Sequence, residues 1–230
     1  MATDGTKQGA SRRYIMSAVE ASLIRLKTDY IDLYQQHDYD PLTPIEESLR
    51  ALDDLVRQGK VRYIGNSNFP AWRLAEAELV ARQMNVGRFV SCQDEYSLVV
   101  RDIEKDLLPA AKEYNLGLLP FFPLASGLLT GKYQRGAAAP ADTRFAKAPA
   151  LKDRYVTPRN EDIVEKLQAF AQQRGHAMLE LAFSWLASRP QVSSVIAGAT
   201  RPEQIEQNVK AIAWTLNADD MAEIDKITQG

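Results

Sequence analysis

Apolar residues recur at helical spacing in long stretches, and these stretches alternate with short runs rich in Val, Ile and aromatic residues. The first long stretch carries Ile15, Val19, Leu23 and Leu26 on one face. This spacing predicts an amphipathic helix, for which Ser11 is a suitable N-cap. Residues 30–36 follow as a strand.

The next helix has a clear start and stop. Thr43 is a candidate N-cap, Pro44 suits the first helical position and Glu46 completes a capping box. The apolar face comprises Ile45, Leu49, Leu52 and Val56. Gly59 follows the last periodic residue, as is common at a helix C-terminus.

The same alternation continues along the chain and predicts a βα repeat. Further strands are expected at 61–65, 89–93, 117–121 and 192–197, and helices at 72–84, 103–114, 158–174 and 178–188, with two closing helices after the last strand. A long segment at 122–157, rich in Ala, Pro and Gly, interrupts the repeat. Loops of this length are usually functional or disordered.

Parallel strands joined by helical crossovers either close into a barrel or form an open, doubly wound sheet. The periodicity does not decide between them. Polar residues follow the strands, at His37, at Ser67 and Asn68, at 93–96, within 123–132 and at 198–201. Because a (β/α)8 barrel builds its active site from the loops at the carboxyl ends of its strands, this placement favours an α/β fold of the barrel type.

Composition and charge argue against several classes of protein. A chain of 230 residues with a formal net charge of −2 supports one hydrophobic core and has no positive excess for nucleic acid. The single Cys92 excludes an intrachain disulfide or thiolate metal cluster, and the N-terminus is too polar for a signal peptide. The most apolar stretch, 116–129, contains two prolines and is too short to cross a bilayer. We expect a cytoplasmic protein without membrane or nucleic-acid partners.

Four motifs give the chain a specific resemblance. They are DLYQQH at 32–37, GKVRYIGNSNF at 59–69, FFPLASGLLTGKY at 121–133 and GATRPEQIEQN at 198–208. In this order and spacing they resemble the aldo-keto reductases, in particular those of the bacterial stress-protein type, from about Ser11 to the C-terminus. The resemblance implies a TIM barrel, NADP as cofactor and a small-molecule carbonyl substrate, an aldehyde or ketone reduced to an alcohol. It also implies that residues 1–230 form a single domain.

His37 is the candidate catalytic residue. An imidazole at the carboxyl end of a strand can orient a carbonyl oxygen or take part in proton transfer, since it titrates near neutral pH. The ordinary alternative is a capping or core histidine. The resemblance places the histidine that polarises the substrate carbonyl at this position.

Ser67, Asn68 and Gln93 offer hydroxyl and amide groups that can satisfy both ends of a nicotinamide carboxamide. Asn-Ser-Asn after a strand is otherwise typical of turns and helix caps. Phe121 lies where the resembled family usually has a tyrosine that stacks on the nicotinamide ring, so it keeps the π face and lacks the hydroxyl. Packing in the barrel is the equally ordinary interpretation of Phe121.

Two further segments are candidates for the remainder of the cofactor. The first contains Pro123, Leu124, Ala125, Gly127 and Lys132, small residues whose backbone N–H groups can approach a pyrophosphate together with one cation. The second contains Gly198, Thr200 and Arg201, followed by a helix with Gln204, Gln207 and Asn208 on one face. A guanidinium at a helix N-terminus suits a 2′-phosphate, and the resemblance assigns the polar face to the adenine end. A solvated polar face is the alternative.

The resemblance also predicts what is not in these 230 residues. Five of eight barrel strands are expected, without the first three βα units and without the family's catalytic Asp, Tyr and Lys. Met1 to Ala10 resembles the loop leading into the third helix. Tyr14, Tyr30 and Tyr34 do not stand in the missing tyrosine's motif.

An N-terminally truncated barrel of this kind leaves two strand edges unpaired, at 30–36 and 192–197. Unpaired edges favour association with another chain, so we expect self-association. Two other functions remain open: a non-catalytic nucleotide-binding subunit similar to channel-associated β subunits, and a non-functional fragment.

Overall fold

The computed structural model describes residues 9–133, 135–136 and 143–229. The chain forms two compact units. The first comprises residues up to Asp94 together with 104–118, and the second comprises 95–103 and residues from 119 onward. The resemblance of Met1 to Ala10 to a barrel loop falls largely outside the described residues. The single-domain organisation stays a prediction.

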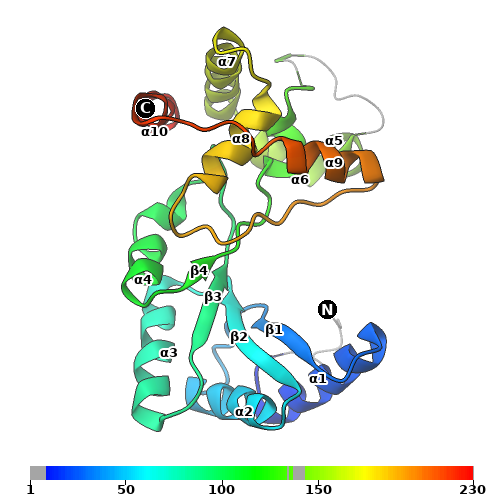
Figure 1. Cartoon of the computed structure of the whole chain (residues 1–230), viewed down its shortest axis with the longest axis vertical. Helices are drawn as coiled ribbons and strands as arrows, with labels where there is room; N and C mark the ends of the chain where they lie inside the picture. The colour runs from blue at the N-terminus through cyan, green and yellow to red at the C-terminus, as the bar shows by residue number, and fades with distance from the viewer. Residues whose placement is uncertain (1–8, 134, 137–142, 230) are drawn as a thin grey trace. The chain divides into compact units, whose positions relative to one another are not determined.

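The first unit is a parallel sheet with helices between its strands. The strands are β1 (Ile31–Gln36), β2 (Val61–Ser67), β3 (Phe89–Gln93) and β4 (Gly117–Leu118), in the order β1-β2-β3-β4. The helices are α1 (Arg12–Leu26), α2 (Ile45–Arg57), α3 (Ala71–Met84) and α4 (Leu107–Glu113). Neighbouring helices contact one another in chain order (Figure 1). This is the expected βα repeat.

Burial follows the predicted apolar faces. Ile15, Val19 and Leu23 of α1 are buried, whereas Leu26 is exposed. Ile45, Leu49 and Leu52 of α2 are almost completely buried, as is Ile64 of β2. The predicted Val56 is only partly buried, and Leu55, which was not predicted, is buried in its place. Removing such side chains from water supplies the main driving force for folding of this unit.

The helix ends confirm one predicted cap and correct another. The Ser11 hydroxyl accepts a hydrogen bond from the Tyr14 N–H at 3.3 Å, as an N-cap does. The predicted capping box of α2 is wrong, because the helix begins at Ile45 with Pro44 at the N-cap and no side-chain cap. The Thr43 hydroxyl instead donates to the Asp40 carboxylate at 2.6 Å.

The prediction of a fifth strand at 192–197 is wrong, because the sheet in the described residues contains four strands. Val192 takes part in an isolated bridge, and the Ile196 N–H donates to the Pro120 carbonyl at 3.0 Å, but the segment forms no continuous strand. The fourth strand is also shorter than expected, because Phe121 forms only an isolated bridge with Glu95. The α/β architecture is that of a partial (β/α)8 barrel, and the barrel is not closed.

The second unit is helical. It contains the 3₁₀ segment η2 (Ala125–Thr130) and helices α5 (Arg144–Lys147), α6 (Pro149–Tyr155), α7 (Pro158–Gln173), α8 (Met178–Ala187), α9 (Pro202–Lys210) and α10 (Ala218–Gln229). A short 3₁₀ turn, η1 (Asp102–Glu104), lies at the boundary of the units. The long segment expected to be a loop therefore contains η2, α5 and α6.

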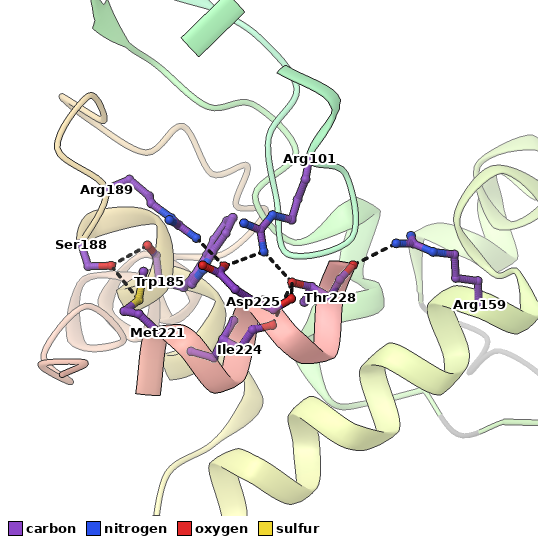
Figure 2. Close-up of polar contacts among 9 residues, drawn as sticks. All are labelled: Arg101, Arg159, Trp185, Ser188, Arg189, Met221, Ile224, Asp225 and Thr228. Atoms are coloured by element: carbon purple, nitrogen blue, oxygen red, sulfur yellow. Dashed lines mark hydrogen bonds and ion pairs between the residues drawn. The ribbon is translucent and has the colours of Figure 1, made fainter. Parts of the chain in front are cut away.

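A charged cluster fixes the C-terminal helix within the second unit (Figure 2). Asp225 of α10 forms ion pairs with Arg101 at 2.8 Å and with Arg189 at 3.1 Å. Both guanidinium groups lie over the ring of the fully buried Trp185, 5.1 and 4.4 Å from its centroid. Arg159 adds a hydrogen bond to the Thr228 carbonyl at 2.9 Å. Within the described residues, no helix is long and apolar enough to span a membrane.

Candidate cofactor site

The carboxyl ends of β1, β2 and β3 meet in a group of hydrogen-bonded polar side chains. Ser67 is the last residue of β2 and pairs in register with Gln93, the last residue of β3. The Ser67 hydroxyl donates to the Gln93 backbone carbonyl at 2.7 Å. The Asn68 N–H donates to the same carbonyl at 3.2 Å. Parallel strand ends thus bring these three predicted residues together.

Asn68 holds the turn that follows β2. Its backbone φ is +57°, in the left-handed region that asparagine tolerates better than most residues. Its Nδ2 donates to the His37 carbonyl and to the Ser67 hydroxyl, each at 3.0 Å. Both amide protons of Asn68 are therefore used within the protein, and its Oδ1 remains as an acceptor.

Gln93 is oriented by a neighbour that the sequence analysis did not identify. Gln35 of β1 donates from its Nε2 to the Gln93 Oε1 at 2.7 Å. This contact occupies the carbonyl end of the Gln93 amide and leaves its Nε2 as a donor. The signal available in the sequence was slight: a polar residue two positions before His37, hence on the same face of the strand.

Asp94 is a buried acid immediately after Gln93, and it lies in the polar segment 93–96 that the sequence analysis named without giving Asp94 a role. The residue is 6% exposed, and its Oδ2 has no hydrogen-bond partner. Burial raises its pKa to about 7, and a hydrogen bond from the Asn68 backbone only partly offsets this. Burial, with the nearby Asp94 charge, likewise raises the pKa of the Cys92 thiol to about 12. Cys92 is therefore not a reactive thiolate at neutral pH.

The structure places His37 directly after β1, as expected, with its side chain exposed. Tyr34 of the same strand is oriented differently. Burial raises the pKa of its phenol, and the neighbouring charges that act on it are Tyr14 and Arg25 of α1. Tyr34 therefore faces the helix layer.

In the second unit, Phe121 is half-buried. Its ring makes an edge contact with Phe122 at 5.3 Å between centroids. Glu95, bridged to Phe121 through the backbone, accepts a hydrogen bond from the Tyr155 hydroxyl at 2.5 Å and pairs with Arg154. The Glu95 contacts, which sequence reasoning did not identify, tie α6 to this segment. Burial, followed by the bond to Glu95, raises the pKa of Tyr155.

The segment 123–132 has an unusual backbone. Ala125, Ser126 and Gly127 have φ values of +45°, +56° and +106°. The Ala125 N–H donates to the Phe122 carbonyl and the Gly127 N–H to the Leu124 carbonyl, each at 2.8 Å, so the turn uses these two N–H groups itself. The Lys132 Nζ lies 3.5 Å from the position that a Cβ of Gly127 would occupy. Pro123 is buried and Leu124 precedes η2.

The segment 198–208 runs into α9 as predicted. Arg201 is the N-cap of this helix and Pro202 its first residue. Gln204 Oε1 accepts hydrogen bonds from the Thr200 N–H at 2.7 Å and from its hydroxyl at 3.2 Å. Arg201 is exposed and forms no ion pair with any described residue. Gly198 is also exposed, and Gln207 and Asn208 lie on the helix.

The predicted site residues therefore fall into two sets. The first unit brings together His37, Ser67, Asn68 and Gln93. The second unit carries Phe121, the 123–132 segment and the 198–208 segment. Their roles toward a cofactor stay predictions.

Comparison with known proteins identifies the family. The Aldo/keto reductase family profile matches residues 1–229. The chain therefore belongs to the aldo/keto reductase family.

Three relatives illustrate its range. The chain is 39% identical over 208 residues to a probable voltage-gated potassium channel subunit beta from Oryza sativa subsp. japonica, covering 89% of the chain and 63% of that protein. It is 35% identical over 224 residues to L-glyceraldehyde 3-phosphate reductase from Escherichia coli, covering 95% and 64%. It is 34% identical over 223 residues to an uncharacterized oxidoreductase from Bacillus subtilis, covering 97% and 66%. The chain thus spans somewhat less than two thirds of the length of these relatives.

Proposed function

We propose that the protein is an NADP(H)-dependent oxidoreductase that reduces an aldehyde or ketone to an alcohol. The observation that carries the proposal is the pair of amides at the ends of β2 and β3, Asn68 and Gln93, in a member of the aldo/keto reductase family. A cytoplasmic location is part of the same proposal.

The two amides suit a nicotinamide carboxamide. Such a group carries a carbonyl acceptor and an NH₂ donor. Gln93 retains its Nε2 as a donor because Gln35 occupies its Oε1, and Asn68 retains its Oδ1 as an acceptor because its Nδ2 is used. Ser67 donates to the Gln93 backbone and supports this arrangement.

The second unit supplies groups for the phosphates. The Lys132 cation beside the turn of η2 suits the pyrophosphate, and Arg201 at the N-terminus of α9 suits a 2′-phosphate. Gln204, Gln207 and Asn208 are assigned to the adenine end, and the ring of Phe121 to the nicotinamide face. Pro123, Leu124, Ala125, Gly127, Gly198 and Thr200 complete the proposed set.

When bound, a reduced nicotinamide supplies the hydride for carbonyl reduction. His37 of this chain would donate a hydrogen bond to the carbonyl oxygen. The His37 imidazole is exposed. The contact between His37 and Asn68 is made by the His37 backbone carbonyl and leaves the ring free to bind the substrate. Tyr34 is unsuited to protonate that oxygen, because its phenol faces α1.

A second function remains in consideration because one relative in the comparison is a probable channel subunit beta. The protein would then bind the nucleotide without turnover. Amino-acid sequence preceding these 230 residues in a longer reading frame would discriminate. An Asp and a Tyr a few residues apart, with a Lys about one strand later, favour the enzyme. A non-functional fragment would show no cooperative folding.

NADPH titration and an aldehyde assay test the proposal. We expect the 230-residue chain to bind NADPH without oxidising it at a normal rate, because a positioned acid contributes about 10²–10⁴-fold and Tyr34 does not supply one. Absence of NADPH binding would refute the proposal for these residues. Turnover at about 1–10³ s⁻¹ with any aldehyde would show that His37 and its neighbours suffice without the family's tyrosine.

A further inference from the structure

One hydrogen bond in the first unit joins side chains from strands that are not neighbours. Gln35 is on β1 and Gln93 is on β3, and β2 lies between them. In register, Gln35 pairs with Gly65 of β2, and Ser67 of β2 pairs with Gln93. The Gln35 Nε2 nevertheless reaches the Gln93 Oε1 at 2.7 Å. The Gln35 side chain therefore crosses over β2.

Gly65 makes this crossing possible. A Cβ built on Gly65 would lie 3.1 Å from the Gln35 Oε1 and 2.4 Å from the Ser91 Oγ. The first distance is tight and the second is a clash with a side chain of the adjacent strand. Gly65 does not adopt a positive φ, so backbone freedom does not explain the residue. The glycine is explained instead by the space that its missing side chain leaves above β2 for the side chain of Gln35.

We infer that Gln35 is a positioning residue of the cofactor site: by crossing Gly65 and binding the carbonyl of the Gln93 amide, it fixes Gln93 as a hydrogen-bond donor to the ligand. The inference rests on the proposed function. It identifies Gln35 as the residue that decides whether Gln93 presents its NH₂ group or its carbonyl to the nicotinamide carboxamide. Without Gln35, the Gln93 amide can rotate, and either end can face the ligand.

Two unsatisfied oxygen atoms beside Gly65 also support a functional role for Gln35. The Gln35 Oε1 and the Ser91 Oγ are both buried and have no hydrogen-bond partner. An unsatisfied buried polar atom lowers stability, so two in one cluster are not explained by folding. Local costs of this kind are typical of functional sites. Replacing Gln35 by an apolar residue removes one of these oxygens and should leave the fold intact.

The test uses two substitutions at one position and one control. Gln35→Leu removes the donor and keeps the approximate volume. Gln35→Glu keeps the shape but offers only acceptors when ionised, so the Gln93 amide must turn its Nε2 toward the new carboxylate. Gln36→Leu is the matched control, because Gln36 is adjacent on β1 but bonds only the Asp38 carbonyl, at 3.0 Å.

Affinity is measured by titration calorimetry for two probes, NADPH and 2′-phospho-ADP-ribose, which lacks the nicotinamide ring. We expect Gln35→Leu to weaken NADPH binding roughly threefold to tenfold, as loss of one hydrogen bond does. Gln35→Glu should weaken it more, although glutamate is closer to glutamine in shape. Binding of 2′-phospho-ADP-ribose should be unchanged in both variants, and Gln36→Leu should match the wild type with both probes.

The outcomes are distinct. If the wild type binds NADPH and the Gln35 variants bind it equally well, Gln35 has no positioning role. If both probes weaken together, Gln35 acts only through stability, and the inference is also wrong. If Gln35→Glu binds NADPH better than Gln35→Leu, Gln93 presents its carbonyl instead of its NH₂ group, which overturns the stated polarity. If the wild type binds neither probe, the proposed function fails, and the inference with it.

Discussion

The buried carboxyl of Asp94 should make the stability of the first unit depend on pH in a specific direction. Burial raises the pKa of this group from 3.8 to about 7 in the folded state. The folded protein therefore binds a proton more tightly than the unfolded chain. The group contributes its full stability below the unfolded pKa, and this contribution is lost as the pH rises through about 7.

The magnitude follows from the difference between the two pKa values. A shift from 3.8 to about 7 is about three units, and each unit corresponds to 1.36 kcal/mol. The upper limit is therefore roughly 4 kcal/mol, since water penetration lowers the cost of a buried charge.

Asp94→Asn isolates the effect. The amide keeps an acceptor for the Asn68 N–H and carries no charge at any pH. Urea unfolding is followed between pH 4 and pH 9 by tryptophan fluorescence in a Trp185→Phe, Trp214→Phe background, which leaves Trp72 of the first unit as the reporter. We expect Asp94→Asn to have nearly the stability of the wild type at pH 4, and to exceed it by up to roughly 4 kcal/mol at pH 8.5.

Asp29→Asn serves as the control, because this carboxyl is exposed. It should show no such pH-dependent difference. A constant difference between Asp94→Asn and the wild type across the whole pH range would refute the reasoning, as would a difference that grows toward acid.

Two further predictions concern the second unit and the sheet. Arg201→Ala should abolish most of a preference for NADPH over NADH, because a hydrogen bond to a charged group contributes roughly 1.5–3 kcal/mol. Lys210→Ala, at the opposite end of α9, is the control. Equal affinity of the wild type for both cofactors would contradict the role of Arg201. Because β1 is an edge of the described sheet, we expect the 230-residue chain to self-associate in size-exclusion chromatography with light scattering, and Leu33→Lys to weaken this association. A monomer that unfolds cooperatively would show that the edge is protected.

Sequence alone determined the elements whose signal is local. The apolar spacing from Ile15 to Leu23 predicts α1, and Ser11 caps it as expected, since a cap depends only on residues within one turn. The parallel β1-β2-β3 order follows from the βα alternation, because consecutive strands with helical crossovers tend to lie side by side. The four motifs indicated the family that the comparison establishes.

Tertiary structure decided the features that depend on neighbours distant in the chain. The segment at 192–197 has the composition of a strand, yet a strand exists only where a partner supplies its hydrogen bonds, and here Ile196 makes one bond to Pro120. Thr43 has the right type for a cap, but Asp40 binds its hydroxyl. The role inferred for Gln35 could not be predicted from spacing, because its partner is 58 residues away and is reached only across the glycine of an intervening strand.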